Sequence, residues 1–271
     1  FIFLMNQKLS RLFNSAINDF SLVEKDDCIL VGLSGGKDSL SLIHFFSLLQ
    51  KERPNTFKVI AAHIRFTNLP YSVDIDYLRE FCAERDIEFK LVEDKIRDEH
   101  MGNGTCLHCS RYRRAKLMEL ARVFKCNKLA LGHHLDDIVA TLLMNMSQHG
   151  RFGGMAVKLN IQVGEFNYPL TIIRPLCYFP EDDIRQFVKE NGFKSEKCRC
   201  PWGDTGYRSK TRDVVDFICK QDESFRMNIF KSQFNVSEKM LNNINENNKN
   251  IKHFTNDIED AGDKINCNCN K

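Results

Sequence analysis

The 271-residue chain has no long apolar run, no large excess of either charge and no internal repeat at a solenoid period. Its longest apolar runs, such as residues 28–33 and 43–49, fall far short of the ~18 residues that a membrane helix needs. Lys and Arg number 39 against 36 Asp and Glu, and this net charge of +3 is far from the basic balance of a DNA-coating protein. The sequence therefore predicts no membrane span, and any contact with nucleic acid must come from local basic clusters.

The sequence also lacks an apolar segment followed by a small-residue cleavage site, which a secretion signal would contain. Its eleven cysteines are therefore not expected to form the disulfide framework of a short secreted protein. We expect a reducing, cytoplasmic location in which some of the thiols bind metal or react.

Short β-prone runs alternate with helical patterns through most of the chain, which is 42% hydrophobic and can bury one sizeable core. The runs predicted as strands are residues 28–33, 58–64, 88–92, 128–131 and 168–176. The main segments predicted as helices are residues 39–50, 77–85, 111–124, 138–146 and 180–191. Such alternation predicts an α/β fold, with a parallel sheet and helices on both faces.

Changes in composition along the chain predict three parts. Residues 1–25 form an amphipathic lead-in helix, and residues 26–193 form the α/β domain. Residues 194–271 form a cysteine-containing helical extension, which ends in an Asn- and Lys-rich tail that we expect to be poorly ordered.

A glycine-rich hexapeptide lies where the first predicted strand turns into a helix, and it reads Ser34-Gly35-Gly36-Lys37-Asp38-Ser39. Backbone N–H groups and a helix N-terminus converge at such a turn and form a hollow for an anion. Lys37 can neutralise a phosphate, the two serines add hydroxyl donors, and Asp38 could hold Mg²⁺. The simpler alternative is a glycine turn with a capping serine.

The hexapeptide is not a Walker A loop, because Lys37 is followed by Asp38 instead of Ser or Thr. It resembles the PP-loop of N-type ATP pyrophosphatases, which cleave ATP between the α- and β-phosphates and adenylate an oxygen of their substrate. The resemblance implies that the loop grips the departing pyrophosphate, with Lys37 and Asp38 as catalytic residues.

A second polar motif, Gly132-His133-His134-Leu135-Asp136-Asp137, follows the fourth predicted strand. Parallel sheets bind ligands beyond the carboxyl ends of their strands, so Asp136 and Asp137 are expected near Mg²⁺ or the nucleotide. The alternative is a helix N-cap with a first-turn acid. The resemblance to PP-loop enzymes implies that His63, at the end of the second predicted strand, lies in the nucleotide pocket, and the alternative is a satisfied core histidine.

Cys106 and Cys109 form a C-x-x-C motif, and Cys198 and Cys200 follow about ninety residues later in a proline-containing turn. By itself the C-x-x-C motif fits zinc, an iron–sulfur cluster, a redox pair or a chance pair. The four thiols could meet in space.

Three motifs occur in order with plausible spacing, namely the PP-loop, residues 132–137 and residues 173–176 (Ile-Arg-Pro-Leu). Together they resemble the tRNA 2-thiocytidine (TtcA) group of PP-loop enzymes, and the resemblance covers residues 9–218. The resemblance implies an adenine nucleotide alpha hydrolase-like fold. In that group the C-x-x-C and one further cysteine bind a [4Fe–4S] cluster whose open iron carries sulfur. Cys106 and Cys109 are then ligands, and Cys200 is favoured as the third, which leaves Cys198 free for persulfide chemistry. The reverse assignment of Cys198 and Cys200 stays open.

Two basic stretches flank the cysteines, and their residues are Arg111, Arg113, Arg114 and Lys116, then Arg208, Lys210 and Arg212. Such stretches suit a negatively charged RNA backbone, although solvated helix faces look the same. Tyr112, Trp202 and Tyr207 could stack on a splayed-out base or pack in the core.

The resemblance implies a tRNA sulfurtransferase that uses ATP and Mg²⁺. It adenylates the C2 oxygen of a cytidine at anticodon-loop position 32, sulfur attacks C2, and AMP leaves. The expected partners are tRNA and a sulfur donor, either a cysteine desulfurase or sulfide, and homodimerisation is left open. The alternatives are thiolation of another base such as uridine or of a small molecule, amidation with ammonia, and a zinc-stabilised binding module without catalysis.

Overall fold

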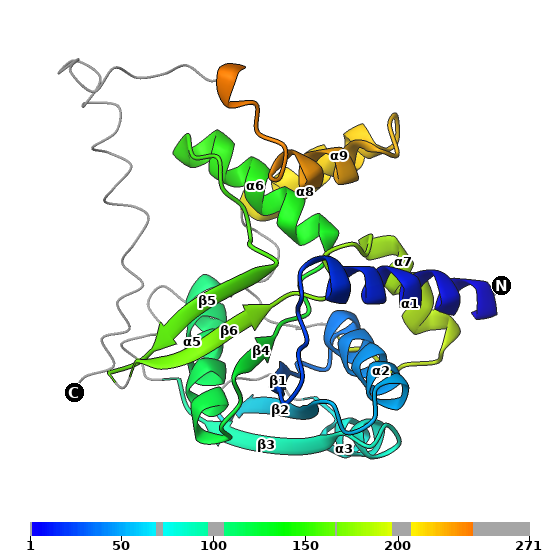
Figure 1. The fold of residues 1–271 in the computed structure, drawn as a ribbon, viewed down its shortest axis with the longest axis vertical. Coiled ribbons are helices and arrows are strands. Elements are labelled where there is room, and N and C mark those ends of the chain that lie inside the picture. Colours follow the sequence, from blue (N-terminus) through cyan, green and yellow to red (C-terminus); the bar gives the residue numbers. More distant parts are fainter. Residues whose placement is uncertain (1, 69–72, 97–105, 166, 197–206, 241–271) are drawn as a thin grey trace. The chain divides into compact units, whose positions relative to one another are not determined.

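The computed structural model describes residues 2–68, 73–96, 106–165, 167–196 and 207–240 (Figure 1). The chain forms two compact units. The first unit comprises residues 1–136 and 156–206, and the second comprises residues 137–155 and 207–271. In the described ranges, no helix combines the length and the apolar character that crossing a membrane requires. The expected division at residues 25 and 193 stays a prediction.

The first unit is built on a six-stranded sheet with the strand order β3-β2-β1-β4-β6-β5 (Figure 1). The strands are β1 (Cys28–Gly32), β2 (Lys58–Phe66), β3 (Glu88–Asp94), β4 (Lys128–Ala130), β5 (Lys158–Val163) and β6 (Tyr168–Ile173). Every pairing is parallel except that of β5 with β6. The predicted α/β fold with a mainly parallel sheet is therefore confirmed.

The antiparallel edge strand β5 was not predicted from the sequence. None of its residues is fully buried, and Leu159 exposes 42% of its surface. A strand at the edge of a sheet with one face in solvent carries no continuous apolar run, which is the pattern that marks the buried strands. The adjoining strand β6 is also shorter than expected: it ends at Ile173, whereas the predicted strand reaches residue 176.

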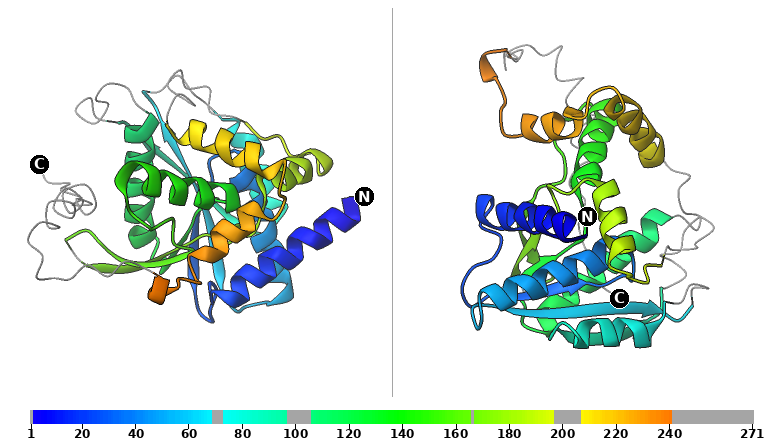
Figure 2. Two further views of the ribbon diagram at one scale, coloured as in Figure 1. Left: turned by 90° about the horizontal axis from the view of Figure 1, so that it is seen from above. Right: turned by 90° about the vertical axis from the view of Figure 1, so that its right-hand side faces the viewer.

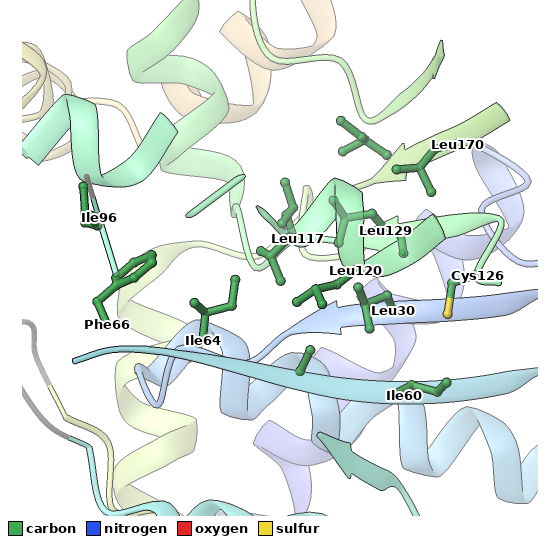
Figure 3. Close-up of a cluster of buried hydrophobic side chains, with 14 residues drawn as sticks. Leu30, Ile60, Ile64, Phe66, Ile96, Leu117, Leu120, Cys126, Leu129 and Leu170 are labelled. Carbon is green, nitrogen blue, oxygen red and sulfur yellow. The ribbon is translucent and has the colours of Figure 1, made fainter. Parts of the chain in front are cut away.

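Helices cover both faces of this sheet (Figures 1 and 2). In the described residues, the helices of the first unit are α1 (Ile2–Asp19), α2 (Lys37–Glu52), α3 (Ile75–Ala83), α5 (Cys106–Val123) and α7 (Glu181–Glu190). Helix α5 packs against the sheet through Leu117 and Leu120, which meet Leu30 of β1 and Leu129 of β4 in a buried cluster (Figure 3).

An aromatic cluster joins the helices that pack together on the other side of the sheet. The ring of Phe45 in α2 stacks on Phe13 of α1, with 5.5 Å between centroids, and on Phe187 of α7, with 5.1 Å. All three side chains are buried. The cluster fixes α7 beside α2, and these two helices carry most of the charged groups of the candidate site.

The second unit contains most of α6 (Leu135–His149), together with α8 (Tyr207–Cys219) and α9 (Phe225–Ser232). Helices α8 and α9 pack against each other, and Arg226 forms an ion pair with Asp216 at 2.6 Å. They are the helical extension that the sequence predicts.

Candidate active site

The PP-loop and the second polar motif, which begins at Gly132, meet where the strand order reverses. From β1 the chain continues to β2 and β3 on one side, whereas β4 and β6 lie on the other side. Ligands of α/β sheets bind at such a switch point, outside the carboxyl ends of the strands. A Cβ atom placed on Gly132, after β4, would lie 3.2 Å from the Cβ of Asp38 and from the backbone N of Ser39. The structure thus brings the two predicted motifs into direct contact.

The two serines of the PP-loop fix the shape of the loop. The hydroxyl of Ser39 accepts the N–H of Ser34 at 3.1 Å and donates to the carbonyl of Gly36 at 3.0 Å. The hydroxyl of Ser34 accepts the N–H of Gly36 at 3.2 Å. In the structure both hydroxyls bond within the loop, and their role as phosphate donors stays a prediction.

The start of α2 supplies the donors that remain for an anion. The helix begins at Lys37, and its N-cap is Gly36, which has no side chain with which to cap the first turn. The first N–H groups of a helix have no acceptor within the helix, and the helix dipole adds positive potential there. The loop therefore has backbone donors available at the start of α2, and their contact with a phosphate stays a prediction.

Gly35 holds the loop in a conformation that needs glycine. Its φ angle is 82°, in the left-handed region, and an added Cβ would lie 2.6 Å from a methyl carbon of Val73. Its carbonyl accepts the N–H of Glu196 at 3.0 Å, so a segment far along the chain also braces the loop.

The ammonium of Lys37 lies between two carboxylates. Its Nζ is 2.7 and 2.9 Å from the carboxylate oxygens of Asp38, and it is 3.1 Å from Oε1 of Glu181 at the start of α7. Burial raises the pKa of Glu181, but Lys37, with His134 and Arg185, more than offsets this and lowers it below its usual value. Glu181 is thus a charged carboxylate at neutral pH.

Asp136 connects the second polar motif to α7. Its Oδ2 accepts the backbone N–H of Glu181 at 2.8 Å and lies 3.5 Å from Nδ1 of His134. His134 also approaches the PP-loop, with 3.9 Å between its Nε2 and Oδ1 of Asp38. The sequence predicted either a ligand-binding role for Asp136 or an N-cap of its own helix. In the structure it caps a different helix, and both Asp136 and His134 are buried.

Asp137 lies in the second unit, where it forms an ion pair with Arg212 of α8. Arg212 was predicted in a basic stretch that faces RNA, but here its guanidinium contacts a carboxylate. Asp137 and Arg212 are thus associated with each other, while Asp136 belongs to the network around Glu181.

His63 lies beside the entry to the PP-loop. The side chain is 3% exposed, and its Nδ1 donates to the carbonyl of Leu33, the residue before Ser34, at 2.8 Å. Burial lowers the pKa of His63, and nearby Arg113 and Arg65 lower it further, although the bond to Leu33 acts in the opposite direction. Because Nδ1 carries the hydrogen, Nε2 of the neutral ring is a hydrogen-bond acceptor.

The C-x-x-C motif occupies the first turn of α5. The helix begins at Cys106, and Cys109 is half-buried against the cluster of buried side chains under α5. A helix N-terminus stabilises thiolates, so the position suits metal ligands. The side chain of Cys106 and both Cys198 and Cys200 lie outside the described residues. Within the described part of the chain, no three His, Cys, Asp or Glu side chains gather as a metal site.

The basic stretch of α5 is only partly available to RNA. Lys116 pairs with Asp94 at 3.3 Å and with Glu119 at 3.0 Å, and the guanidinium of Arg113 lies 5.2 Å from the ring centroid of Phe66. Arg111 and Arg114 are exposed.

The aromatic residues predicted to stack on a base are only partly described. Tyr112 packs edge-on against Phe66, and its hydroxyl donates to the carbonyl of Lys95 at 3.3 Å, which favours the core interpretation. Trp202 and the side chains of Tyr207 and Arg208 lie outside the described residues.

Glu181 is the site residue that sequence reasoning missed. The available signal was weak, because an acid directly after Pro180 reads as an ordinary first-turn residue of a helix. Only the packing of α7 beside α2 brings it to Lys37, and no periodicity in the sequence encodes that contact.

Comparison with known proteins extends this description. The PP-loop domain family matches residues 5–197. A tRNA-cytidine(32) 2-sulfurtransferase from Syntrophotalea carbinolica is 37% identical over 201 residues, which cover 72% of this chain and 75% of the relative. The protein of the same name from Geotalea uraniireducens is 34% identical over 234 residues, which cover 83% and 90%.

A solved structure shares the fold. It is the U34-tRNA thiolase NcsA from Methanococcus maripaludis with its [4Fe-4S] cluster, which matches with a TM-score of 0.71 at 24% identity and covers 89% of this chain and 84% of that protein. The resemblance seen in the sequence motifs is confirmed by these matches. The chain therefore belongs to the PP-loop family and, within it, groups with the proteins named tRNA-cytidine(32) 2-sulfurtransferase.

Proposed function

We propose that this protein is an ATP-dependent tRNA sulfurtransferase that replaces the C2 oxygen of cytidine 32 with sulfur. The observation that carries the proposal is the 34% identity to the Geotalea uraniireducens tRNA-cytidine(32) 2-sulfurtransferase over 90% of that protein. An intact PP-loop at the switch point of the sheet supports it, because adenylation needs a grip on the departing pyrophosphate.

The chain's own groups account for the handling of ATP. The open N–H groups at the start of α2 and the ammonium of Lys37 bind the pyrophosphate and stabilise the charge that builds up as it leaves. His63, whose Nδ1 bonds the carbonyl of Leu33 beside the loop, would accept a hydrogen bond from the nucleotide through Nε2. Asp38 is suited to bind Mg²⁺, because its side chain is 29% exposed beside the phosphate hollow.

The sulfur chemistry is assigned to the cysteines. Cys106, Cys109 and Cys200 would hold the [4Fe–4S] cluster, which supplies the sulfur, and Cys198 would serve as the free thiol. The position of Cys106 and Cys109 in the first turn of α5 supports their part in this ligand set.

The proposed partners are tRNA and a sulfur donor, a cysteine desulfurase or sulfide, in a reducing cytoplasm. The exposed Arg111 and Arg114 follow the C-x-x-C on the same helix and are the phosphate contacts we propose. Phosphate contacts at these two charges would bring the RNA backbone close to the C-x-x-C motif at the start of the same helix.

Mass spectrometry of tRNA nucleosides tests the function. Cells without the gene should lose 2-thiocytidine, and the wild-type gene should restore it. The variant Asp38→Ala should not restore 2-thiocytidine, whereas Asp182→Ala, an exposed carboxylate in the first turn of α7, should do so.

Other outcomes would redirect the proposal. Loss of a thiolated uridine would change the acceptor base and keep the chemistry. Unchanged nucleosides, together with colourless protein that holds stoichiometric zinc after anaerobic purification, would favour a binding module without catalysis.

A further inference from the structure

Glu181 links three parts of the site at one residue. Its Oε1 lies 3.1 Å from Nζ of Lys37 and accepts a hydrogen bond from Arg185 at 2.7 Å, one turn further along α7. Its backbone N–H donates to Asp136 at 2.8 Å. The side chain is only 18% exposed. The backbone and the carboxylate of Glu181 are therefore both fixed by named partners.

The direction of these contacts determines where the ammonium of Lys37 lies. Asp38 is the next residue along the chain, and its carboxylate draws the ammonium toward the PP-loop itself. Glu181 holds it from a separate helix, α7. Lysine has a long flexible stem, so a single partner would leave its ammonium many positions. Two carboxylates on different elements restrict it to one.

The helix α7 does not need the charge of Glu181 to form. Two further acids, Asp182 and Asp183, lie in its first turn and complement the helix dipole. Asp183 also forms an ion pair with Lys8 at 2.7 Å. The contact between Glu181 and Lys37 is thus additional to the stabilisation that this helix obtains from its other acidic residues.

We propose that Glu181 is a positioning residue that holds the ammonium of Lys37 at the start of α2, ready for the pyrophosphate that leaves ATP. The proposal rests on the proposed function, in which ATP is split into AMP and pyrophosphate. A charge that is fixed during folding needs no reorganisation when the transition state forms. Loss of the Glu181 contact should therefore lower kcat more than it weakens the binding of ATP. Asp136 contributes indirectly, because its carboxylate holds the backbone N–H of Glu181, the first residue of α7.

The first test measures the formation of AMP with tRNA present, in three variants of full-length protein. Glu181→Ala should lower kcat by roughly tenfold or more and change the KM for ATP by less than about threefold. Glu181→Gln should recover most of the activity, because its amide oxygen still accepts a hydrogen bond from Lys37. Asp182→Ala, in the same helical turn, should behave like the wild type.

A double-mutant cycle tests whether Glu181 acts through Lys37. In a Lys37→Ala background, Glu181→Ala should cause no further loss of kcat, because the two residues are coupled. A further loss as large as that in the wild-type background would overturn the proposal, and so would an unchanged kcat in Glu181→Ala alone.

A third measurement does not depend on activity. Acetic anhydride should label Lys37 faster in nucleotide-free Glu181→Ala than in the wild type, as read by peptide mass spectrometry, whereas Asp182→Ala should leave the rate unchanged. Equal labelling of Lys37 in all three proteins would overturn the proposal. Wild-type protein that forms no AMP would instead refute the proposed function, and the labelling would still decide whether Glu181 holds Lys37.

Discussion

The sulfur atoms of Cys28 and Cys126 lie 3.1 Å apart, although the two residues are 98 positions apart in the sequence. Cys28 begins β1 and Cys126 precedes β4, so the pair lies at the end of these strands opposite the PP-loop. Burial raises the pKa of the Cys126 thiol, and the bond to Cys28 raises it further.

We expect a small disulfide such as oxidised glutathione to convert this pair into an internal disulfide. Each thiol loses its hydrogen, and the reagent is reduced to two thiols. Closing a loop of this length should raise the free energy of unfolding by about 4–5 kcal/mol in the chain-entropy account. Peptide mass spectrometry and urea unfolding measure the two effects.

Cys177→Ser is the matched control for that experiment, because Cys177 is fully buried and should not reach the reagent, whereas Cys28 is only partly buried and can make the first attack. Cys28→Ser should abolish the disulfide. Recovery of Cys28 and Cys126 only as separate glutathione adducts would contradict the prediction.

Substitution of Gly35 should disable the PP-loop. Gly35→Ala places a methyl group 2.6 Å from Val73 at a φ of 82°, so the backbone is strained and either the loop or Val73 must shift. Gly164→Ala is a suitable control, because Gly164 also has a positive φ, 64°, but has nothing within 4 Å of the added carbon. Isothermal titration with ATP should show binding lost in the first variant and kept in the second. Equal ATP affinity in both would argue against a phosphate hollow at this loop.

Iron content checks the ligand set. Cys106→Ala, Cys109→Ala and Cys200→Ala should each lose iron after anaerobic purification, and Cys198→Ala should retain it. A cluster with only two of its three cysteine ligands is not held firmly, and its absorption near about 400 nm should fade with the iron. If Cys198→Ala loses iron and Cys200→Ala keeps it, the two cysteines exchange roles.

Removing the charges of Arg111 and Arg114 together should weaken the binding of tRNA. Each phosphate contact contributes about 0.7 to the slope of log K against log salt for single strands, so the slope should fall by up to about 1.4. Arg113 is left in place because it lies over Phe66. Titrations at several salt concentrations measure the slope, and an unchanged value would mean that neither arginine contacts a phosphate.

Protonation of His44 should destabilise the fold in mild acid. Burial, with Arg85 and Lys51, lowers the pKa of His44 from 6.5 to about 4, and the ring lies edge-on to Phe187 at 5.3 Å. The unfolded chain therefore binds the proton more readily than the folded chain. The contribution of neutral His44 to the free energy of unfolding is fully present above pH 6.5 and is lost as the pH falls toward 4.

Urea unfolding at several pH values measures this effect against His44→Phe, which cannot titrate. The wild type should lose about 2–3 kcal/mol relative to the variant between neutral pH and pH 4. A difference between the two proteins that stays constant with pH would contradict the prediction.

The sequence predicted the PP-loop and the fold because their signals are local. A buried run that ends in Ser34 and Gly35 and continues as a helix needs no distant information, and the same holds for β4 and the motif after it. The edge strand β5 was missed because none of its positions is fully buried.

The contacts within the site could not be predicted, because they join residues far apart in the chain. Asp136 was recognised as a site residue, but its bond to the N–H of Glu181 depends on how α7 packs. Glu181 itself looks like any acid at the start of a helix. The bond of the Ser34 hydroxyl inside the loop was not predicted either, since the sequence does not show where a hydroxyl points.

The ion pair between Lys37 and Glu181 also fixes when the site can form during synthesis. The two residues are 144 positions apart, so a ribosome that adds about 5–20 residues per second needs about 7–30 s to pass from one to the other. Through this interval the emerging chain has its PP-loop lysine but not the helix that positions it. Completion of α7 is therefore the step in translation that first makes the nascent chain competent to hold Lys37 in place.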